Sequence, residues 1–352
     1  MPSAQKLKLP KVTPGQLIED TTAWTPEDFA GERSWARPLD AAMIAEIADA
    51  AKDFLRRGIA PKEIRAADFP LEKTRPLIDA LYRDLEADYG FAVLSEFPVD
   101  DFDDEILQAA YCGLCSHFGT ITLQNREGEY LLEVTDKGLA YDEQMRGYHS
   151  SAYLNFHNDG TNTVTLLCQE TAVEGGLSML LSGPTAYNEI VRNHPEYLDI
   201  LHRGFHHHLR NQREPDDPVV TPYRTPVFSF YNDLFHMAYA RPSINFCEAE
   251  GIVITPQEKA ALDYFDSVIT RPELALPMEL RKGDLQFVNN FLVLHSRTAY
   301  KDGPNQRRKL LRLWLDDENS QRLGPGKMDW YLPAQSRFTR LGGLDSLEMA
   351  AE

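Results

Sequence analysis

The feature that most constrains the fold is a set of three potential metal ligands that are far apart in the chain. His157 and Asp159 are two residues apart, and His295 follows far downstream. Residues i and i+2 of an extended strand project from the same face, so this histidine and aspartate can bind one metal ion. The segment Gly283–Arg297 has the pattern of a turn followed by an apolar strand. We expect this strand to bring His295 into the same cavity from an opposite sheet.

Two histidines and one carboxylate are the ligand set of Fe(II) sites that activate dioxygen. Such a triad leaves three adjacent coordination positions open, whereas a structural zinc site is closed by four ligands. A histidine followed two residues later by aspartate is common by chance, so the surrounding sequence must support the pair. The β-branched, apolar run Thr163–Cys168 predicts a strand that leaves the site, and Asp159-Gly160 predicts a bend before it.

Three other clusters are better explained without a metal. His194 and Glu196 lie between two helical patterns, so we expect them on the solvated surface. The run His206–His208 has no carboxylate at ligand spacing, and we favour a strand whose imidazoles are partly buried or line the cavity wall. Cys112 and Cys115 lie on an amphipathic helical pattern and are predicted to be core residues.

An anionic co-substrate would need a cationic partner in the same cavity. The run Arg307–Leu315 begins basic and turns apolar, as a strand that enters the core would. On that strand Arg308, Leu310 and Arg312 share one face. Because the guanidinium is a planar fork that matches a carboxylate, Arg308 and Arg312 are the candidates for this contact.

The order of these motifs resembles that of the Fe(II)/2-oxoglutarate-dependent dioxygenases of the taurine dioxygenase and TfdA-like superfamily, and also of gamma-butyrobetaine hydroxylase-type enzymes. The resemblance covers residues 90–320 and rests on His157-Asn-Asp159, Gly175-Gly-Leu-Ser178, Gly283-Asp-Leu-Gln286, His295 and Arg308. It implies a mainly β fold with helical decoration, in which the two sheets of a double-stranded β-helix, or jelly roll, enclose the iron. An N-terminal helical region would precede this core.

The resemblance also implies roles for particular residues. The iron ligands would be His157, Asp159 and His295. Arg308 would bind the distal carboxylate of 2-oxoglutarate, assisted by the hydroxyl of Ser178, which stands where the family usually has threonine. Arg312 matches a second family arginine and is ranked below Arg308 as the anchor. The implied reaction uses O2 to convert 2-oxoglutarate to succinate and CO2. It is coupled to hydroxylation, desaturation or cyclisation of a small polar molecule such as an amino acid, amine or carboxylate.

Four further residues are candidates for contacts with the substrate: Tyr153, Asn155, Arg241 and Asn290. Tyr153 and Asn155 precede the metal motif on a strand that enters the cavity, and Asn290 lies shortly before His295. Arg241 could bind a substrate carboxylate, or it could pair with a surface acid. The proline-interrupted residues 204–253 predict loops over the site, where substrate identity would be determined.

The length favours one large β-fold over several small domains. Residues 1–89 are expected to form an arm and helices that pack on the core. Residues 90–320 would be the dioxygenase core, and residues 321–352 an aromatic segment that closes over the site or meets a second subunit. Helical patterns cover 38–55, 71–89 and 103–118, and a first core strand covers 91–97.

Composition excludes some partners. The chain has 54 acidic and 36 basic residues and a formal charge of -18, which would repel a nucleic acid. No stretch reaches the apolar length of a membrane span. Four cysteines and the lack of an apolar leader predict a cytoplasmic protein. We expect a small-molecule substrate and allow for a homo-oligomer.

Two other classes of function stay open at this point. One is a jelly-roll metal-binding protein without catalysis, and the other is a metal-dependent isomerase or hydrolase that does not use 2-oxoglutarate. The first gives no reason for Ser178 and Arg308 to accompany the three ligands, and the second would not need Arg308.

Overall fold

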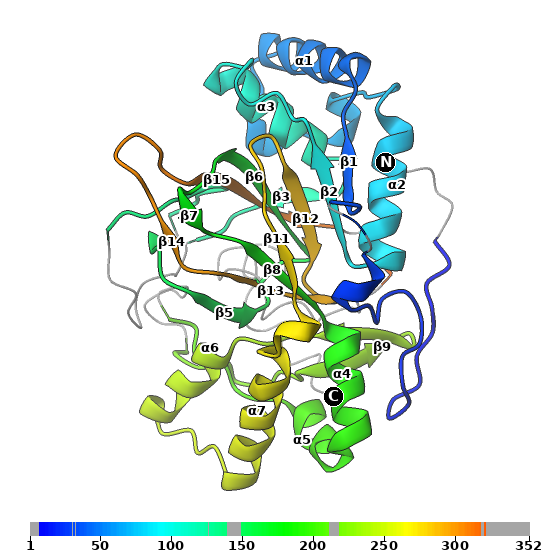
Figure 1. Ribbon diagram of the computed structural model, residues 1–352, viewed down its shortest axis with the longest axis vertical. Coiled ribbons are helices and arrows are strands. Elements are labelled where there is room, and N and C mark those ends of the chain that lie inside the picture. The colour runs from blue at the N-terminus through cyan, green and yellow to red at the C-terminus, as the bar shows by residue number, and fades with distance from the viewer. Residues whose placement is uncertain are drawn as a thin grey trace.

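The computed structural model describes residues 7–29, 31, 33–125, 127–138, 149–210, 218–317 and 320–321. Their fold is sheet-rich with several helices (Figure 1). The larger sheet has the order β1 (Ala36–Pro38), β2 (Phe91–Ser95), β12 (Leu285–Asn289), β6 (Thr163–Glu170), β15 (Lys309–Asp316) and β3 (Thr120–Thr122), with β4 (Leu131–Val134) also paired with β15. The smaller sheet has the order β11 (Leu276–Met278), β8 (Ser178–Ser182), β13 (Val293–Arg297) and β5 (Leu154–His157). Two-stranded pairs are formed by β10 (Leu234–Met237) with β9 (Phe228–Tyr231), and by β14 (Tyr300–Lys301) with β7 (Glu174–Gly175).

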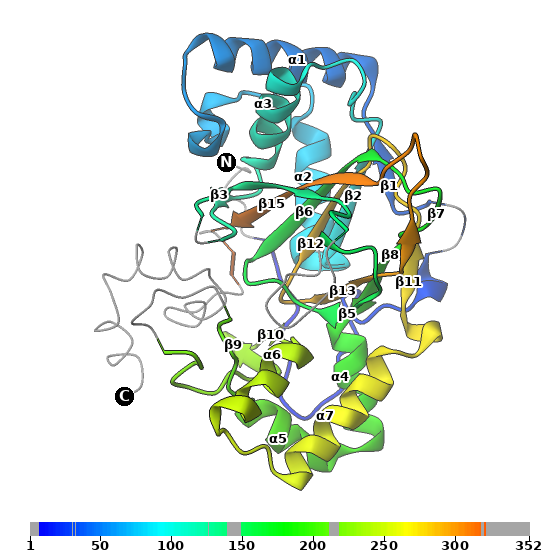
Figure 2. The same ribbon diagram turned by 90° about the vertical axis from the view of Figure 1, so that its left-hand side faces the viewer.

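Helices cover the two ends of this β structure (Figures 1 and 2). One group consists of α1 (Ala41–Arg56), α2 (Arg75–Arg83) and α3 (Asp104–Cys115), and the other of α4 (Gly183–Asn193), α5 (Leu198–Arg203), α6 (Arg241–Asn245) and α7 (Pro256–Ile269). The first group shares a buried apolar core with one face of the larger sheet, which includes Ile47, Ile78, Leu107, Leu94, Phe287 and Leu313. The second group packs with the smaller sheet through residues that include Tyr187, Leu201, Phe265, Leu180 and Leu294.

Alternation along β15 divides the larger sheet into two faces. Leu311 and Leu313 face the core that the first helix group covers. Leu310 and Arg312, together with Arg308 just before the strand, line a cavity on the opposite face. The predicted sharing of one face by these three residues is therefore confirmed. One face of the larger sheet therefore packs against helices and stabilises the fold, and the other face lines the cavity.

The predicted single strand within Gly283–Arg297 is wrong, because the segment forms β12 and β13 in two different sheets. The turn between them is set by Asn289, whose side chain accepts a hydrogen bond from the Phe291 amide and donates one to Glu86. Asparagine favours such turns because its side chain can hydrogen-bond the local backbone. Consequently His295 does not come from an opposite sheet. It lies in the same sheet as His157 and is paired with it directly across β13 and β5.

Helix boundaries follow local capping. Asp40 accepts the amides of Ala42 and Met43 at the start of α1, and Asp103 accepts the Ile106 amide at the start of α3. The predicted helix over 71–89 is shorter than expected, because α2 gives way to a π-helical turn at Asp84–Asp88. Further 3-10 turns lie at Pro26–Asp28, Pro61–Glu63, Ala66–Asp68, Pro195–Tyr197, Phe246–Glu250 and Pro272–Leu274.

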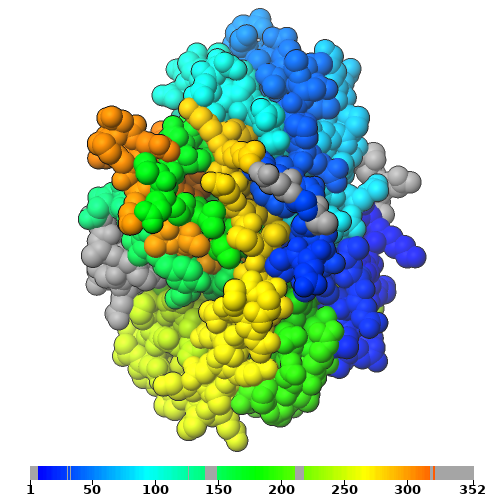
Figure 3. All heavy atoms as spheres, in the orientation of Figure 1, coloured from blue at the N-terminus to red at the C-terminus, as the bar shows by residue number. Residues whose placement is uncertain are grey.

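The N-terminal region contributes more than an arm and helices. Its strand β1 extends the larger sheet by pairing in parallel with β2. The residues before it lie between α2 and α4 (Figure 3), where Ile18 exchanges backbone hydrogen bonds with the side chain of Asn188. The predicted aromatic segment at 321–352 lies outside the described residues except for Gln321. Within the described ranges, no helix is both long enough and apolar enough to cross a membrane.

The run His206–His208 is held by local hydrogen bonds. His206 Nδ1 lies 2.7 Å from the carbonyl of Thr221, and His208 Nδ1 accepts the Arg210 amide. His207 is buried, and burial, with a smaller effect from His206, lowers its pKa to about 4. This histidine is therefore neutral in the folded protein near neutral pH.

The buried His207 should make the protein less stable in mild acid. In the unfolded chain a histidine binds a proton below its ordinary pKa of about 6.5, whereas His207 in the folded protein does so only near pH 4. The stabilisation is complete above pH 6.5 and is lost as the pH falls to 4, by about 3 kcal/mol at most. Urea unfolding at pH 7.5 and 4.5 should show a smaller difference in unfolding free energy for His207→Gln than for the parent. Equal differences would contradict this account.

Candidate active site

A cavity lies between the two main sheets. The larger sheet contributes side chains from β4, β6, β12 and β15, and the smaller sheet contributes side chains from β5, β8 and β13. Apolar residues form much of the wall, and the polar lining residues are His157, Asp159, Ser178, Gln286, His295, Ser296, Arg297, Arg308 and Arg312. This combination of an apolar wall with a few convergent polar groups is typical of small-molecule sites.

The two histidines of the triad meet across neighbouring strands. His157 ends β5 and His295 is its direct partner in β13, so their rings lie 4.4 Å apart between centroids. His157 Nδ1 lies 2.8 Å from the carbonyl of Asn155, which leaves Nε2 directed at the site. Burial and the neighbouring His157 lower the pKa of His295 to about 3. The lowered pKa keeps His295 in the neutral form that binds metals, and the Asn155 carbonyl orients the His157 ring.

Asp159 lies beyond the end of β5, so it does not share a strand with His157 as the spacing suggested. Its backbone amide donates to the side-chain oxygen of Asn290, which fixes the turn. Its carboxylate Oδ1 is 3.8 Å from His157 Nε2, and Oδ2 is 3.9 Å from His295 Nε2. The turn therefore places the Asp159 carboxylate beside the His157 ring, a position that we had expected a continuous strand to give it.

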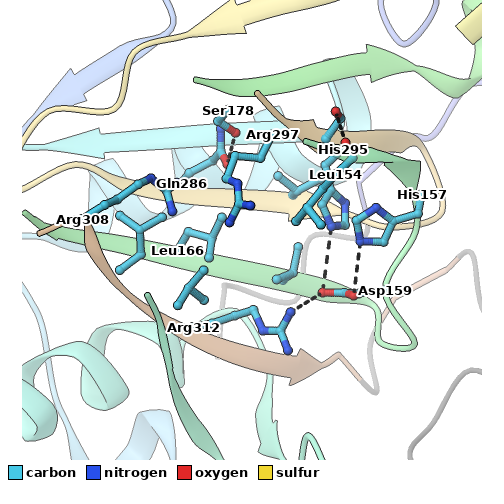
Figure 4. A pocket seen from close by; sticks show the side chains of 15 residues that line it. Leu154, His157, Asp159, Leu166, Ser178, Gln286, His295, Arg297, Arg308 and Arg312 are labelled. Carbon is cyan, nitrogen blue, oxygen red and sulfur yellow. Dashed lines mark hydrogen bonds and ion pairs between the residues drawn. The ribbon is translucent and has the colours of Figure 1, made fainter. Parts of the chain in front are cut away.

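One ligand atom from each of His157, Asp159 and His295 lies within 4.8 Å of the others. Two imidazole nitrogens and one carboxylate oxygen on one side of a common point match the facial triad of Fe(II) oxygenases. Asp159 Oδ2 also accepts a hydrogen bond from Arg312 Nη1 at 3.2 Å (Figure 4). It accepts a second one from Trp314 Nε1 at 3.1 Å. Hydrogen bonds of this kind orient a ligating carboxylate.

Arg308 lies at the other end of the cavity from Asp159 (Figure 4). It is 5% exposed, its Nη1 has no hydrogen-bond partner among the described residues, and burial lowers its pKa. Its side chain crosses Gly176, where a Cβ atom would be 2.9 Å from Nε. Gly176 also has a φ of +75°, which favours glycine. The glycine turn before β8 thus makes room for this arginine.

Ser178 and Arg312 also line the cavity, in different settings. The Ser178 hydroxyl donates to Gln286 Oε1 at 3.0 Å. Arg312 is turned towards the other end of the cavity, where Asp159 and Gln124 accept its hydrogen bonds. The two arginines therefore separate along the cavity, with Arg312 beside the triad and Arg308 remote from it (Figure 4).

The four candidate substrate residues are mostly not brought to the cavity. Tyr153 is 46% exposed, Asn155 is exposed, and neither lines it. Arg241 does not line the cavity, and Asp263 and Asp266 bind its guanidinium at 2.7 and 2.6 Å, which favours the pairing with acids over a contact with a substrate carboxylate. Asn290 does not line the cavity, and its side-chain oxygen accepts a hydrogen bond from the Asp159 amide.

Sequence reasoning assigned no role to several residues of the site, among them Gln286, Arg297 and Trp314. Arg297 follows His295 by two residues on β13, and Trp314 follows Arg312 by two residues on β15. The same i, i+2 rule that selected Arg308 and Arg312 would have found both. Gln286 was quoted only as part of a motif, and its polar side chain alternates with apolar neighbours on β12.

Trp314→Phe should weaken Fe(II) binding, because it removes a hydrogen bond to a ligating carboxylate while keeping most of the aromatic packing. Loss of such a supporting contact costs about 10- to 100-fold in metal affinity, and we expect the lower end because Arg312 still contacts Asp159. Anaerobic calorimetric titration with Fe(II) measures the change. Trp35→Phe, close to the far edge strand β1, is the matched control. An unchanged affinity in Trp314→Phe would show that the indole does not support the ligand.

Sequence comparison relates the chain to proteins of known activity. The model of the family described as "Taurine catabolism dioxygenase TauD, TfdA family" matches residues 55–314. FR-33289 synthase of Streptomyces rubellomurinus is 29% identical over 314 residues, which cover 86% of this chain and 91% of that protein.

Solved structures share the fold. Asparagine oxygenase, in complex with Fe(II), 2S,3S-3-hydroxyasparagine and succinate, matches with a TM-score of 0.62 at 16% identity, over 80% of this chain and 94% of that one. The non-heme iron oxygenase OrfP, in complex with Fe and alpha-ketoglutaric acid, matches with a TM-score of 0.59 at 14% identity, over 80% and 94% of the two chains.

Proposed function

This chain belongs to the taurine catabolism dioxygenase TauD, TfdA family, and from that membership we propose that its cavity hydroxylates a small polar molecule with the triad His157, Asp159 and His295 as iron ligands. The protein is an enzyme of the Fe(II)- and 2-oxoglutarate-dependent oxygenase class. Its cofactor is Fe(II), and its co-substrates are 2-oxoglutarate and O2. The assignment of individual residues is our proposal.

The residues of the cavity fit this cofactor and co-substrate. Two imidazoles and one carboxylate converge at one end, which suits Fe(II) and leaves positions for a chelating keto acid and dioxygen. At the other end the buried Arg308 has an unpaired Nη1 among the described residues. A buried cation needs a charged partner, and the distal carboxylate of 2-oxoglutarate would supply it.

The observation that carries the proposal is this pairing of a triad with a remote buried arginine in one cavity. A metal-binding protein without catalysis gives no reason for the arginine. A metal-dependent isomerase or hydrolase would also not need it.

The chain's own residues have separate tasks in the reaction. When bound, iron supplies the reaction of O2 with 2-oxoglutarate that gives succinate and CO2 and places the second oxygen atom in a substrate C–H bond. His157, Asp159 and His295 hold the metal, while Trp314 and Arg312 keep the carboxylate of Asp159 in place. Arg308 and the Ser178 hydroxyl orient the keto acid from its distal end. The apolar wall residues, such as Leu166 and Val288, limit the entry of water.

We also infer that the two sheets form a double-stranded β-helix with residues 90–320 as its core. The placement of the cavity between the larger and the smaller sheet supports this, as do the two helix groups at the ends (Figures 1 and 2). The matched family segment begins within α1.

The substrate is proposed to be an amino acid, amine or carboxylate. The lining of the cavity, an apolar wall with a few polar groups, supports a small molecule, and the related asparagine oxygenase was crystallised with a hydroxylated amino acid. The test is a screen of such compounds with Fe(II), 2-oxoglutarate and O2, in which succinate and hydroxylated product are measured together. We expect one substrate to give equal amounts of both. Turnover that continued without 2-oxoglutarate would contradict the proposal and favour an isomerase or hydrolase.

A further inference from the structure

Arg308, Arg312 and Arg297 are all buried and line the cavity, and the proposed function uses only the first two. Arg297 is the last residue of β13, is 5% exposed and points into the cavity on the side of His295 that faces Arg308 (Figure 4). Its Nη2 donates to the carbonyls of Ser150 and Ala152 at 2.6 and 2.5 Å. Its Nε and Nη1 are buried and have no hydrogen-bond partner among the described residues.

Arg297 and Arg308 lie at the same end of the cavity. The two guanidiniums lie over one aromatic ring, with their carbons 4.8 and 5.1 Å from the centroid of Tyr300. Of the described residues that line the cavity, Asp159 is the acidic one, and Arg312 already contacts it. Two buried cations close together would be stabilised by an anion between them.

We propose that Arg297 is a second contact for the distal carboxylate of 2-oxoglutarate and joins that carboxylate to the Ser150–Ala152 backbone. This inference rests on the proposed function. Arg308 then binds the carboxylate from one side, and Nε and Nη1 of Arg297 bind it from another. Because Nη2 holds the segment that leads into β5, co-substrate binding also steadies the strand that carries His157. Arg297 is thus a co-substrate-binding residue that also positions the segment before a metal ligand.

The test compares two keto acids that chelate iron in the same way. 2-Oxoglutarate has a distal carboxylate and pyruvate does not. Each is titrated anaerobically into the Fe(II)-loaded protein, and its affinity is measured from the charge-transfer absorbance. Arg297→Gln should weaken 2-oxoglutarate binding on the order of 10- to 100-fold and leave pyruvate binding unchanged. Arg297→Lys should fall in between, because it keeps the charge and loses the fork.

A structural role alone would give a different pattern. If Arg297 only supports the Ser150–Ala152 backbone, both keto acids should weaken equally in Arg297→Gln, and this would overturn the proposal. Arg241→Gln, which removes an arginine outside the cavity, is the matched control and should change neither affinity. Hydrogen exchange gives an independent measurement of the link. 2-Oxoglutarate should slow amide exchange over 150–157 in the parent protein and not in Arg297→Gln.

The inference and the proposed function fail in distinguishable ways. If the parent protein does not bind 2-oxoglutarate, the proposed function fails. If the parent binds it and Arg297→Gln binds it equally well, only the role of Arg297 fails. Thermal unfolding of each variant shows that the comparison is made on folded protein, and Arg297→Lys provides the measurement if Arg297→Gln does not fold.

Discussion

Asp159→Ala is expected to reduce Fe(II) affinity by at least about 100-fold. Loss of a residue that only supports a ligand costs about 10- to 100-fold, so removal of a ligand itself should cost more. The change also leaves Trp314 Nε1 and Arg312 Nη1 without the carboxylate oxygen that accepts both hydrogen bonds. Anaerobic Fe(II) titration measures the affinity, and activity should be lost with the metal.

A surface pair of the same spacing provides the control for Asp159→Ala. His194 Nδ1 lies 2.7 Å from Glu196 Oε1, outside the cavity. We expect Glu196→Ala to bind Fe(II) as the parent does. Parent-like Fe(II) affinity in folded Asp159→Ala would show that this carboxylate is not a ligand.

Arg308→Ala is expected to weaken 2-oxoglutarate binding by about 2–4 kcal/mol, which corresponds to roughly 30- to 700-fold. The side chain is buried, and it is placed at the far end of the cavity from the triad by the turn at Gly176. Fe(II) affinity should stay the same, because Arg308 does not contact the three ligands. Calorimetric or absorbance titration of the Fe(II)-loaded variant with 2-oxoglutarate measures the loss.

The adjacent arginine is the matched control for Arg308→Ala. Arg307 is exposed and precedes Arg308 directly, so Arg307→Ala removes the same charge from the same segment without reaching the cavity. It should bind 2-oxoglutarate normally. If affinity survives in Arg308→Ala and disappears in Arg312→Ala, the roles of these two arginines must be exchanged.

The approach of His157, Asp159, His295 and Arg308 to one cavity could be predicted from sequence, because these residues stand in or beside segments that have the pattern of core strands. Strand alternation then placed Arg308, Leu310 and Arg312 on one face, as the structure has them.

The way in which the ligands meet could not be predicted, because it depends on contacts between distant segments. Asn289 ends β12 by bonding to Glu86, far away in the chain, and this turn sends β13 into the other sheet. Asp159 leaves the strand because the side chain of Asn290 holds its amide. Glu86 and Asn290 are each more than 100 residues away from the residue that they contact, so the local sequence does not reveal them.

Whether an arginine is available to a ligand depends on which acids lie near it in the fold. Asp263 and Asp266 lie on α7 and reach Arg241, which the sequence had suggested as a substrate contact. Arg297, which the sequence did not single out, donates to backbone carbonyls through Nη2, and its Nε and Nη1 have no hydrogen-bond partner among the described residues. These partners come from other segments of the chain, so residue spacing alone does not show which arginine faces the cavity.

The measurement that tests the central claim most directly is an anaerobic titration of the metal-free protein with Fe(II) and then with 2-oxoglutarate, followed by visible absorbance. The account predicts a weak, saturable charge-transfer band that appears only when both are present, that is lost in Asp159→Ala, and that needs a much higher concentration of 2-oxoglutarate in Arg308→Ala. If folded, iron-loaded protein gave no such band at any 2-oxoglutarate concentration, the claim that this cavity binds the keto acid at a His157, Asp159 and His295 iron centre would be contradicted.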